Sequence, residues 1–390
     1  MISSRQAAVY TRFSCLSVTA CGAAGDGKTD DTAAFRAAVD RAREQGVPVF
    51  VPGGTYLLKD TLALEGVSLC GDPAGSWPAD SMTQPLLCFT NPDVPGLTVS
   101  RAAVSGLCFR APGTPDAAPS VLITGDEVKL CALKLHHAAC GVATARKGLR
   151  GLCLTDLFLP DPLKDGLRID GCIGTTHIRN VELWPSTIRP TPFSLEGVGI
   201  RLTDNEDVEL SDCFVWNARR AVVADGQNGR LHLRNCSVDF CADGLVLEGA
   251  CDVRVEGGTF WTHYTGVRMD HDGAGLRLCG MDLKSNGAPT IEVRRAARLD
   301  CEGLIVRRVM DEREVPVMDI AGGRDIRITG CSLSARCRQE PAVRIGHPKA
   351  LCIRDCVISH PAGLAFSPDA DAAYTMKNNA VTVLPPVPGT

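Results

Sequence analysis

Residues 208–284 contain four copies of one nine-residue pattern: VELSDCFVW (208–216), LHLRNCSVD (231–239), VRVEGGTFW (253–261) and LRLCGMDLK (276–284). Small or apolar residues occupy the first, third, sixth and eighth places of each copy. The sixth-place residues Cys213, Cys236, Gly258 and Met281 follow one another at spacings of 23, 22 and 23 residues. A fixed period of this length indicates stacked supersecondary units, none of which buries its apolar face alone.

The fifth place of the pattern identifies the type of stack. It holds Asp212, Asn235, Gly257 and Gly280 here, and Asp156, Asn180, Gly303, Gly330 and Asp355 in flanking copies. These residue types adopt a left-handed backbone at little cost, so each is predicted to form a one-residue corner between two short strands. The apolar alternation on both sides of the corner has period two, which indicates strand and not helix.

A third strand follows in each unit, for example GLRID, GVGIRL, GLVLE or GVRMD. Stacked units of this kind form an all-β solenoid, namely a single-stranded parallel β-helix. The period-two pattern excludes an α-solenoid, and the lack of LxxLxL spacing argues against a leucine-rich repeat.

The whole chain is predicted to form one domain, because a solenoid accommodates 390 residues without a second core. Within this 1–390 domain we expect an N-terminal cap and first strands over 1–65, and irregular early coils and loops over 66–126. Regular coils are expected over 127–368 and a C-terminal tail over 369–390.

Composition limits the partners and the compartment. A net charge of −4 gives no reason to expect nucleic acid or an anionic membrane as a partner, and no apolar run has membrane-spanning length. Arg12 interrupts any hydrophobic signal region, so we predict no signal peptide and a cytoplasmic location. No CxxC pair is accompanied by a second one, so we expect neither a metal site nor a cofactor.

The 19 cysteines do not suggest a disulfide framework. Cys213, Cys236, Cys331 and Cys356 occupy the inward sixth place, where a small apolar residue is needed. They are therefore predicted to form a core column of reduced thiols.

Residues 22–29, GAAGDGKT, satisfy the phosphate-loop pattern GxxxxGK[ST]. Asp26, Asp30 and Asp31 place carboxylates around this segment, and no doubly wound sheet follows, so nucleotide binding is not favoured. The alternative is structural. Asp30 and Asp31 begin a helix whose apolar face caps the open end of the coil stack and which stops near Gly46.

The segment GAAGDGKTDDTAAFRAAVDRAREQGVPVFVPGGTYLL (22–58) resembles the N-terminal signature of the pectate-lyase-3-like branch of the pectin-lyase-like superfamily. That branch includes polygalacturonase-like hydrolases, glucanases and phage tailspike depolymerases. The resemblance implies a right-handed β-helix with a short N-terminal capping helix that acts on or binds carbohydrate. It also implies a possible homotrimer. The polygalacturonase motifs NTD, DD, GHG and RIK are not present as a set, so pectin hydrolysis is not implied.

The ninth place of each copy is predicted to point outward at the edge of the second strand. Reading along the chain, it holds His136, Pro160, Trp184, Trp216, Asp239, Trp261, Lys284, Arg307, Ser334 and Ser359. Because neighbouring coils lie about 4.8 Å apart, these side chains should line one continuous wall. Indole rings stack on the C–H faces of sugars, which favours a glycan site. The alternative is that the Trp residues pack under a loop or in an oligomer interface.

Asp239 is the preferred catalytic carboxylate, because an isolated Asp between Trp216 and Trp261 has poor strand propensity. Asp282 is its predicted partner, two coils on and with Cα atoms roughly 10–12 Å apart. Side chains that lean together would approach the separation of about 6.5–9.5 Å that is typical of inverting hydrolysis. Both residues could instead be ordinary surface carboxylates.

Further residues around this row are predicted to complete the site. His263 is assigned a catalytic role, although a loop His is often only solvated. An insertion over 185–197 lengthens one coil and could wall a subsite. The predicted substrate-binding residues are Trp184, Trp216, Trp261, Asn217, Tyr264, Lys284, Arg268 and Glu196.

Three hypotheses remain open from the sequence. The first is a glycoside hydrolase, or a related glycosyl-transferring enzyme, that uses paired carboxylates on an oligo- or polysaccharide. The second is a polysaccharide lyase or epimerase in which Lys284 or Arg268 removes the C5 proton of a uronic acid. The third is a non-catalytic glycan-binding or phage-tail-like protein.

Overall fold

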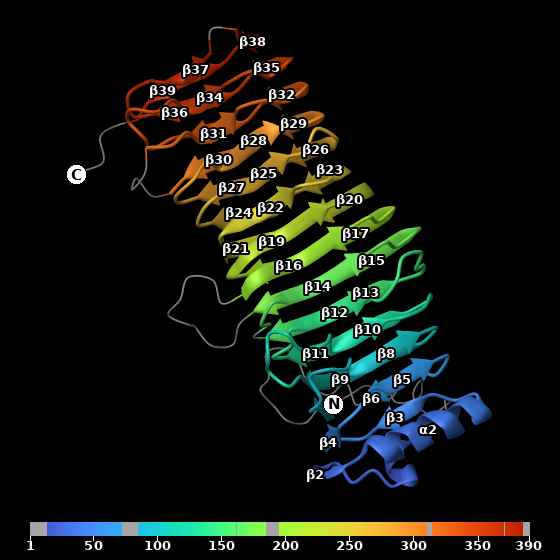
Figure 1. Cartoon of the computed structure of the whole chain (residues 1–390). Coiled ribbons are helices and arrows are strands. Elements are labelled where there is room, and N and C mark those ends of the chain that lie inside the picture. Colours follow the sequence, from blue (N-terminus) through green and yellow to red (C-terminus); the bar gives the residue numbers. More distant parts are fainter. Residues whose placement is uncertain are drawn as a thin grey trace, which may run out of the picture. The chain divides into compact units, whose positions relative to one another are not determined.

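The computed structural model describes residues 14–71, 85–160, 162–184, 195–309, 314–369 and 371–384. These residues form a parallel β-solenoid with one α-helix near the N-terminus (Figure 1). The predicted fold class is thereby confirmed, whereas the right-handed winding and the single domain stay predictions. Contacts divide the chain into two compact units, Met1–Gly166 and Leu167–Thr390, which are described separately.

The first unit contains the helix and the early coils. Its elements are β1 (Leu16–Ser17), the 3₁₀ helix η1 (Val18–Cys21), β2 (Asp26–Asp30), α2 (Thr32–Gln45), β3 (Val49–Val51), β4 (Thr55–Leu58), β5 (Leu62–Glu65), β6 (Leu69–Gly71), β7 (Leu86–Phe89), β8 (Leu97–Ser100), β9 (Ala103–Arg110), β10 (Val121–Ile123), β11 (Lys129–His136), β12 (Cys140–Thr144) and β13 (Cys153–Pro160). A further strand, β14 (Asp165–Asp170), begins at the end of this unit.

The second unit repeats three strands per coil. The first strands are β15 (Thr175–Trp184), β17 (Asp207–Ser211), β20 (Gln227–Arg234), β23 (Ala250–Glu256), β26 (Ala274–Cys279), β29 (Arg298–Glu302), β32 (Asp325–Thr329), β35 (Leu351–Arg354) and β38 (Tyr374–Lys377). The second strands are β18 (Phe214–Trp216), β21 (Ser237–Cys241), β24 (Thr259–Thr262), β27 (Asp282–Ser285), β30 (Ile305–Arg308), β33 (Ser332–Ser334), β36 (Val357–His360) and β39 (Ala380–Val383). The third strands are β16 (Leu195–Thr203), β19 (Ala218–Asp225), β22 (Asp243–Leu247), β25 (Val267–Asp270), β28 (Ile291–Arg295), β31 (Met318–Ile320), β34 (Val343–Ile345) and β37 (Phe366–Pro368).

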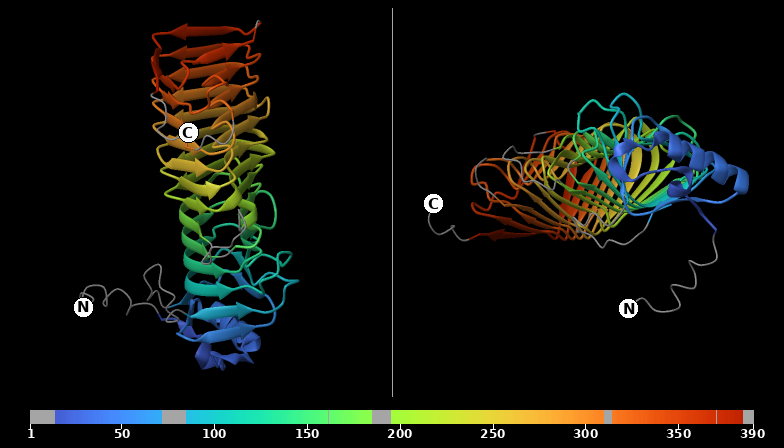
Figure 2. Two further views of the ribbon diagram at one scale, coloured as in Figure 1. Left: turned by 90° about the vertical axis from the view of Figure 1, so that its left-hand side faces the viewer. Right: turned by 90° about the horizontal axis from the view of Figure 1, so that it is seen from below.

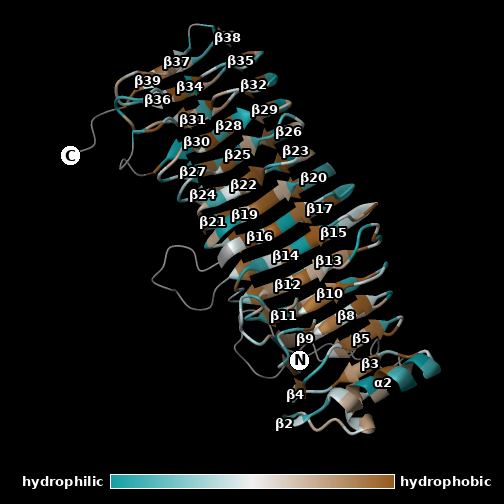
Figure 3. Cartoon of the chain, viewed as in Figure 1, coloured by the Kyte–Doolittle hydropathy of each residue, from teal (hydrophilic) through white to brown (hydrophobic). Residues whose placement is uncertain are grey.

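Strand pairing follows the sequence period. Leu231 of β20 lies beside Val208 of β17 and Val253 of β23, and Val253 lies beside Leu276 of β26. These side chains are almost completely buried. Figure 2 shows the strands of successive coils side by side, and Figure 3 shows apolar and polar residues alternating along them. The second unit therefore has a core of stacked apolar columns, and each coil contributes one residue to each column.

The predicted corners have the predicted backbone. All nine fifth-place residues have positive φ, from 50° at Asn180 to 64° at Gly257: Asp156, Asn180, Asp212, Asn235, Gly257, Gly280, Gly303, Gly330 and Asp355. A left-handed residue turns the chain at this place, which favours Asp, Asn and Gly, although the copy 128–136 has Ala132 there with φ 52°.

Cysteines lie where the pattern placed them. Cys213, Cys236, Cys331 and Cys356 are at most 4% exposed, and all 19 cysteines of the chain are free thiols. Burial raises the pKa of Cys241 to about 12. The thiol of Cys241 is therefore protonated at neutral pH and serves as a small apolar core group.

The N-terminal helix buries the predicted face. Phe35, Ala38, Val39 and Ala42 of α2 are at most 3% exposed, and Gly46 ends the helix with φ 66°. The helix packs against β1, β3 and β5, at the end of the first coils (Figure 2). The capping helix is therefore present as predicted.

In the phosphate-loop-like segment, residues 22–29, backbone N–H groups donate hydrogen bonds to nearby Asp side chains. The N–H groups of Ala24 and Gly25 donate to Asp31 at 2.7 and 3.2 Å, and those of Lys28 and Thr29 donate to Asp26 at 2.9 and 2.8 Å. Amide groups that a phosphate loop directs at its ligand are thus already bonded. The segment is thus held by its own hydrogen bonds and leads into β2.

Residues expected in the C-terminal tail form one more coil. β38 pairs with β35, and β39 pairs with β36, both in parallel register. The regular stack thus continues past residue 369, because Tyr374, Met376 and Val381 repeat the apolar pattern of the preceding coils.

Candidate functional site

The ninth-place residues of the second unit are lateral neighbours, as the period predicts. Trp216 pairs with Asp239, Asp239 with Trp261, Trp261 with Lys284, and Lys284 with Arg307. Trp184 stacks on Trp216 with ring centroids 4.8 Å apart and an interplanar angle of 26°. We call Trp184, Trp216, Asp239, Trp261, Lys284 and Arg307 the ninth-place row.

Pairs of aromatic side chains lie on either side of Asp239 along the row. Phe214 packs on Trp184 at 5.4 Å on one side, and Phe240 packs on Trp261 at 5.0 Å on the other. Trp184 is 36% exposed and Phe240 is 39% exposed, so neither ring belongs to the core. Exposed aromatic rings beside a carboxylate are the arrangement that sugar recognition requires.

Asp239 is the carboxylate of the row, and its surroundings are unusual for a carboxylate. Its Oδ1 atom is shielded from solvent and has no hydrogen-bond partner among the described residues. Burial raises the pKa of Asp239, and the Phe240 N–H and the charges of Lys284 and His263 oppose this only in part. A carboxyl group in such surroundings retains its proton to a higher pH than usual, which suits a general acid.

His263 and Tyr264 lie in the turn between β24 and β25. Burial lowers the pKa of His263, although the nearby charge of Asp239 partly counteracts the shift. The His263 ring meets Phe240 edge-on, with centroids 5.4 Å apart and an angle of 66°. Tyr264 is 40% exposed. The structure thus brings a neutral imidazole and a phenol to the end of the strand that carries Trp261.

Asp282 lies in the neighbouring column, where it pairs with Thr259 and Ile305. Its carboxylate accepts hydrogen bonds from Arg307 at 2.7 and 3.3 Å and forms an ion pair with Lys284 at 3.3 Å. Two cations therefore contact the carboxylate of Asp282. Its approach to Asp239 stays a prediction, and its own partners compete with a role as a base.

The remaining predicted substrate-binding residues have different positions. Asn217 has φ 54°, and its N–H donates to the Asp239 carbonyl oxygen at 3.0 Å, so it supports the backbone of Asp239. The Trp261 indole N–H donates to Asn286 at 3.4 Å. Glu196 belongs to β16, but its side chain lies outside the described residues, as does most of the 185–197 insertion.

Arg268 is not part of the ninth-place row. It lies on β25, among the third strands, and contacts Asp243 at 3.1 Å and Glu292 at 3.0 Å. Asp243 is 8% exposed, and burial raises its pKa. The sequence reasoning missed this cluster. An available signal was the Asp–Gly pair at the start of a third strand, which occurs at Asp165–Gly166 and at Asp243–Gly244.

Replacing Arg268 by Met is expected to lower the free energy of unfolding by about 2 kcal/mol at neutral pH, because two half-buried carboxylates lose their shared cation. The loss should shrink at acidic pH, where those carboxylates are protonated. Chemical denaturation of the variant at both pH values measures it. Arg298→Met is the matched control, since Arg298 joins Asp252 and Asp300 at a more exposed position and should cost at most about 1 kcal/mol.

Turnover of a glycan substrate by the same two variants is a second measurement. We expect equal turnover in Arg268→Met and Arg298→Met, because neither residue lies on the ninth-place row. A much larger loss in Arg268→Met would place the active site over the third strands instead.

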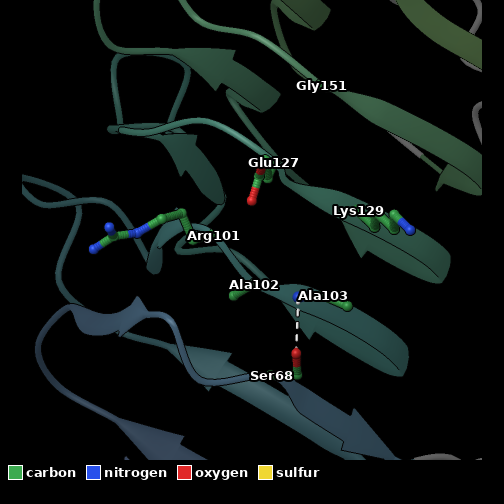
Figure 4. Close-up of a pocket in the computed structure, with 7 residues that line it drawn as sticks. All are labelled: Ser68, Arg101, Ala102, Ala103, Glu127, Lys129 and Gly151. Atoms are coloured by element: carbon green, nitrogen blue, oxygen red, sulfur yellow. Dashed lines mark hydrogen bonds between the residues drawn. The ribbon is translucent and has the colours of Figure 1, made fainter.

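A separate hollow of about 470 Å³ lies in the first unit (Figure 4). Ser68, Arg101, Ala102, Ala103, Glu127, Lys129 and Gly151 line it. The Ser68 hydroxyl accepts the Ala103 N–H at 3.0 Å, and Arg101 is bonded to Glu65 at 3.1 Å. These polar groups serve strand pairing and a surface ion pair, so the hollow offers no catalytic constellation.

Two further features concern the part of the chain that the structure describes. No group of three or more His, Cys, Asp or Glu side chains there is arranged to hold a metal ion. None of the helices there has the length and apolar character needed to span a bilayer.

Comparison with known proteins agrees with the fold. The family described as rhamnogalacturonase A/epimerase, pectate lyase-like, matches residues 15–85. None of the curated proteins matches the sequence. Among solved structures, the A-module of mannuronan C-5 epimerase AlgE6 from Azotobacter vinelandii has 14% identity and a TM-score of 0.53, covering 95% of this chain and 96% of that one.

The catalytic domain of a GH87 α-1,3-glucanase, solved with tetrasaccharides, is similar to the same extent. It has 12% identity and a TM-score of 0.53, and the match covers 88% of this chain and 67% of that one. At such identities the likeness concerns the fold. An epimerase and a hydrolase share it, so the reaction has to be argued from the residues.

Proposed function

We propose that this parallel β-solenoid, whose residues 15–85 match a pectate lyase-like family model, is a carbohydrate-active enzyme that hydrolyses glycosidic bonds along the ninth-place row. The observation that carries the proposal is Asp239, a carboxyl with one shielded oxygen and a raised pKa, which lies between the half-buried rings of Trp216 and Trp261. A purely structural Asp would have a hydrogen-bond partner for a buried oxygen. An unsatisfied oxygen costs stability, which a catalytic role explains.

The proposed reaction begins with protonated Asp239 beside the glycosidic oxygen. Asp239 gives its proton to that oxygen while the bond between the oxygen and the anomeric carbon breaks, and the bonding electrons stay with the oxygen. A water molecule forms the new bond to the anomeric carbon and loses a proton to Asp282. The products are a reducing sugar and a free hydroxyl group, and proton exchange with solvent restores both carboxyls.

The aromatic rings supply the binding part of this mechanism. Trp216 and Trp261 each lie one coil from Asp239, so sugars stacked on them flank the bond to be cleaved. Lys284 and Arg307 hold the Asp282 carboxylate in place through ion pairs, so that one of its oxygens can face the attacking water.

A lyase or epimerase is the second candidate, and the ion pairs of Asp282 favour it. Because Asp282 is neutralised by two cations, the neutral His263 becomes the more available base. His263 or Lys284 would remove the C5 proton of a uronic acid. In a lyase the C4–O bond then breaks, a C4–C5 double bond forms, and Asp239 protonates the leaving oxygen. In an epimerase a proton returns to C5 from the opposite face.

Incubation of the protein with a library of neutral and uronate-containing glycans separates these candidates. Hydrolysis is expected to release reducing ends without ultraviolet absorbance from an unsaturated product. A lyase releases reducing ends with that absorbance, and an epimerase changes the NMR spectrum of the glycan without either signal. Glycan binding without any of the three changes would contradict an enzymatic role and support a binding protein.

A further inference from the structure

Phe240 follows Asp239 and has a backbone that suits its residue type poorly. Its φ is 54°, in the left-handed region, where a bulky side chain is a genuine outlier. The residue at the same place in the preceding coil, Asn217, has the same φ. Asn tolerates this conformation through local hydrogen bonds, whereas Phe has no such compensation. The corner therefore demands a left-handed residue, and a Phe occupies it at a cost.

Core packing does not account for this Phe. Its side chain is 39% exposed, although the neighbouring Cys241 and Ala242 are buried. The pairing between β21 and β24 shifts register between Asp239 and Cys241, so Phe240 is the extra residue of a bulge. Bulges of this kind redirect side chains and are frequent next to active sites. Here the bulge turns an aromatic ring toward the row and away from the core.

The ring of Phe240 touches two residues of the candidate site. Its centroid lies 5.0 Å from that of Trp261 and 5.4 Å from that of His263. It therefore extends the exposed aromatic surface beside Asp239, and it shields the imidazole whose pKa burial lowers.

We infer that Phe240 is a specificity-determining residue, which binds the C–H face of the sugar ring next to Asp239 together with Trp261 and keeps His263 away from water. The inference rests on the proposed function, since it assigns a substrate contact of the same site. It explains why the strained position holds an aromatic ring: the ring contributes to binding and to the state of His263, and not to folding.

Phe240→Asn is the decisive variant, because it installs the residue that the preceding coil already uses at this corner. The fold is expected to be retained, with a melting temperature equal to or above that of the wild type. KM for the glycan should rise about 10-fold with a smaller change in kcat. The His263 pKa, followed by NMR, should rise toward its ordinary value. Phe240→Leu is the control for size: it should preserve most of the His263 shift yet lose the stacking, so KM rises while the pKa stays low.

Two results would overturn the inference: unchanged KM in Phe240→Asn, or a His263 pKa that does not move. If the wild type turns over no glycan, the proposed function fails separately. A glycan array then tests Phe240 alone. Signals of the wild type that Phe240→Asn loses support the inference, whereas equal signals, or none for either protein, refute it.

Discussion

Replacing Asp239 by Asn is expected to lower turnover of the glycan about 100- to 10,000-fold while leaving the folded chain at least as stable at neutral pH. Asn cannot donate the proton that the proposed acid supplies. It also removes a carboxyl whose ionised form is disfavoured by burial and whose Oδ1 has no hydrogen-bond partner among the described residues. A residue retained for folding would show the opposite stability change.

The stability difference between Asp239→Asn and the wild type should depend on pH. Burial raises the pKa of Asp239 in the folded protein above its unfolded value, so the folded state binds this proton more tightly. The wild type is therefore favoured below the unfolded pKa and loses this contribution as pH rises through the folded pKa. The stability advantage of Asp239→Asn should accordingly be small in acid and largest at neutral pH.

Urea denaturation of both proteins at acidic and neutral pH measures the effect. Asp282→Asn is the contrasting variant, because it leaves Lys284 and Arg307 without their carboxylate and should lose about 0.5–1 kcal/mol. If Asp239→Asn were instead destabilised at neutral pH and retained full turnover, Asp239 would be a structural residue.

Gly258→Ala is expected to destabilise the protein by about 3 kcal/mol or more. Gly258 has φ 87°, and an added Cβ would overlap the carbonyl oxygen of Cys236 in the preceding coil. A left-handed Ala costs about 1–2 kcal/mol, and forcing apart two packed coils adds about 1–3 kcal/mol. The prediction tests how closely successive coils pack at the sixth place.

The neighbouring Gly257 provides the matched control. Its φ is 64°, yet an added Cβ would have no atom within 4 Å. Gly257→Ala should therefore cost only the backbone term of about 1–2 kcal/mol. Thermal and chemical denaturation of the two variants measure the difference, and equal losses would contradict direct stacking of Gly258 on Cys236.

The fold could be predicted because its corners and strands each require particular residue types at positions close together in the sequence. A corner such as Asp212 or Gly257 needs a residue that tolerates positive φ, and the strands around it need alternation of period two. The spacing from Cys213 to Cys236 then sets the register of whole coils. The row from Trp216 to Trp261 follows from the same period, and the observed pairing confirms it.

The chemistry of the site could be predicted only in part, because it depends on contacts across coils. Asp282 was predicted from the sequence as the partner of Asp239. Its ion pairs with Lys284 and Arg307 were not, because they depend on rotamers that the sequence does not specify. Arg268 has the spacing of a site residue, yet it lies among the third strands and bonds Asp243. Phe240 was not singled out, because it follows the nine-residue pattern and the sequence does not show the bulge that exposes its ring.

The central claim is that Trp216, Asp239 and Trp261 form one glycan-binding row in which Asp239 is the acid. Titration of Asp239→Asn with a glycan that the wild type converts, followed through the indole N–H signals in NMR spectra, tests it directly. We expect the signals of Trp216 and Trp261 to shift together and to saturate, with no conversion of the glycan. Saturable binding that leaves both indole signals unmoved, or continued conversion by the variant, would contradict the account.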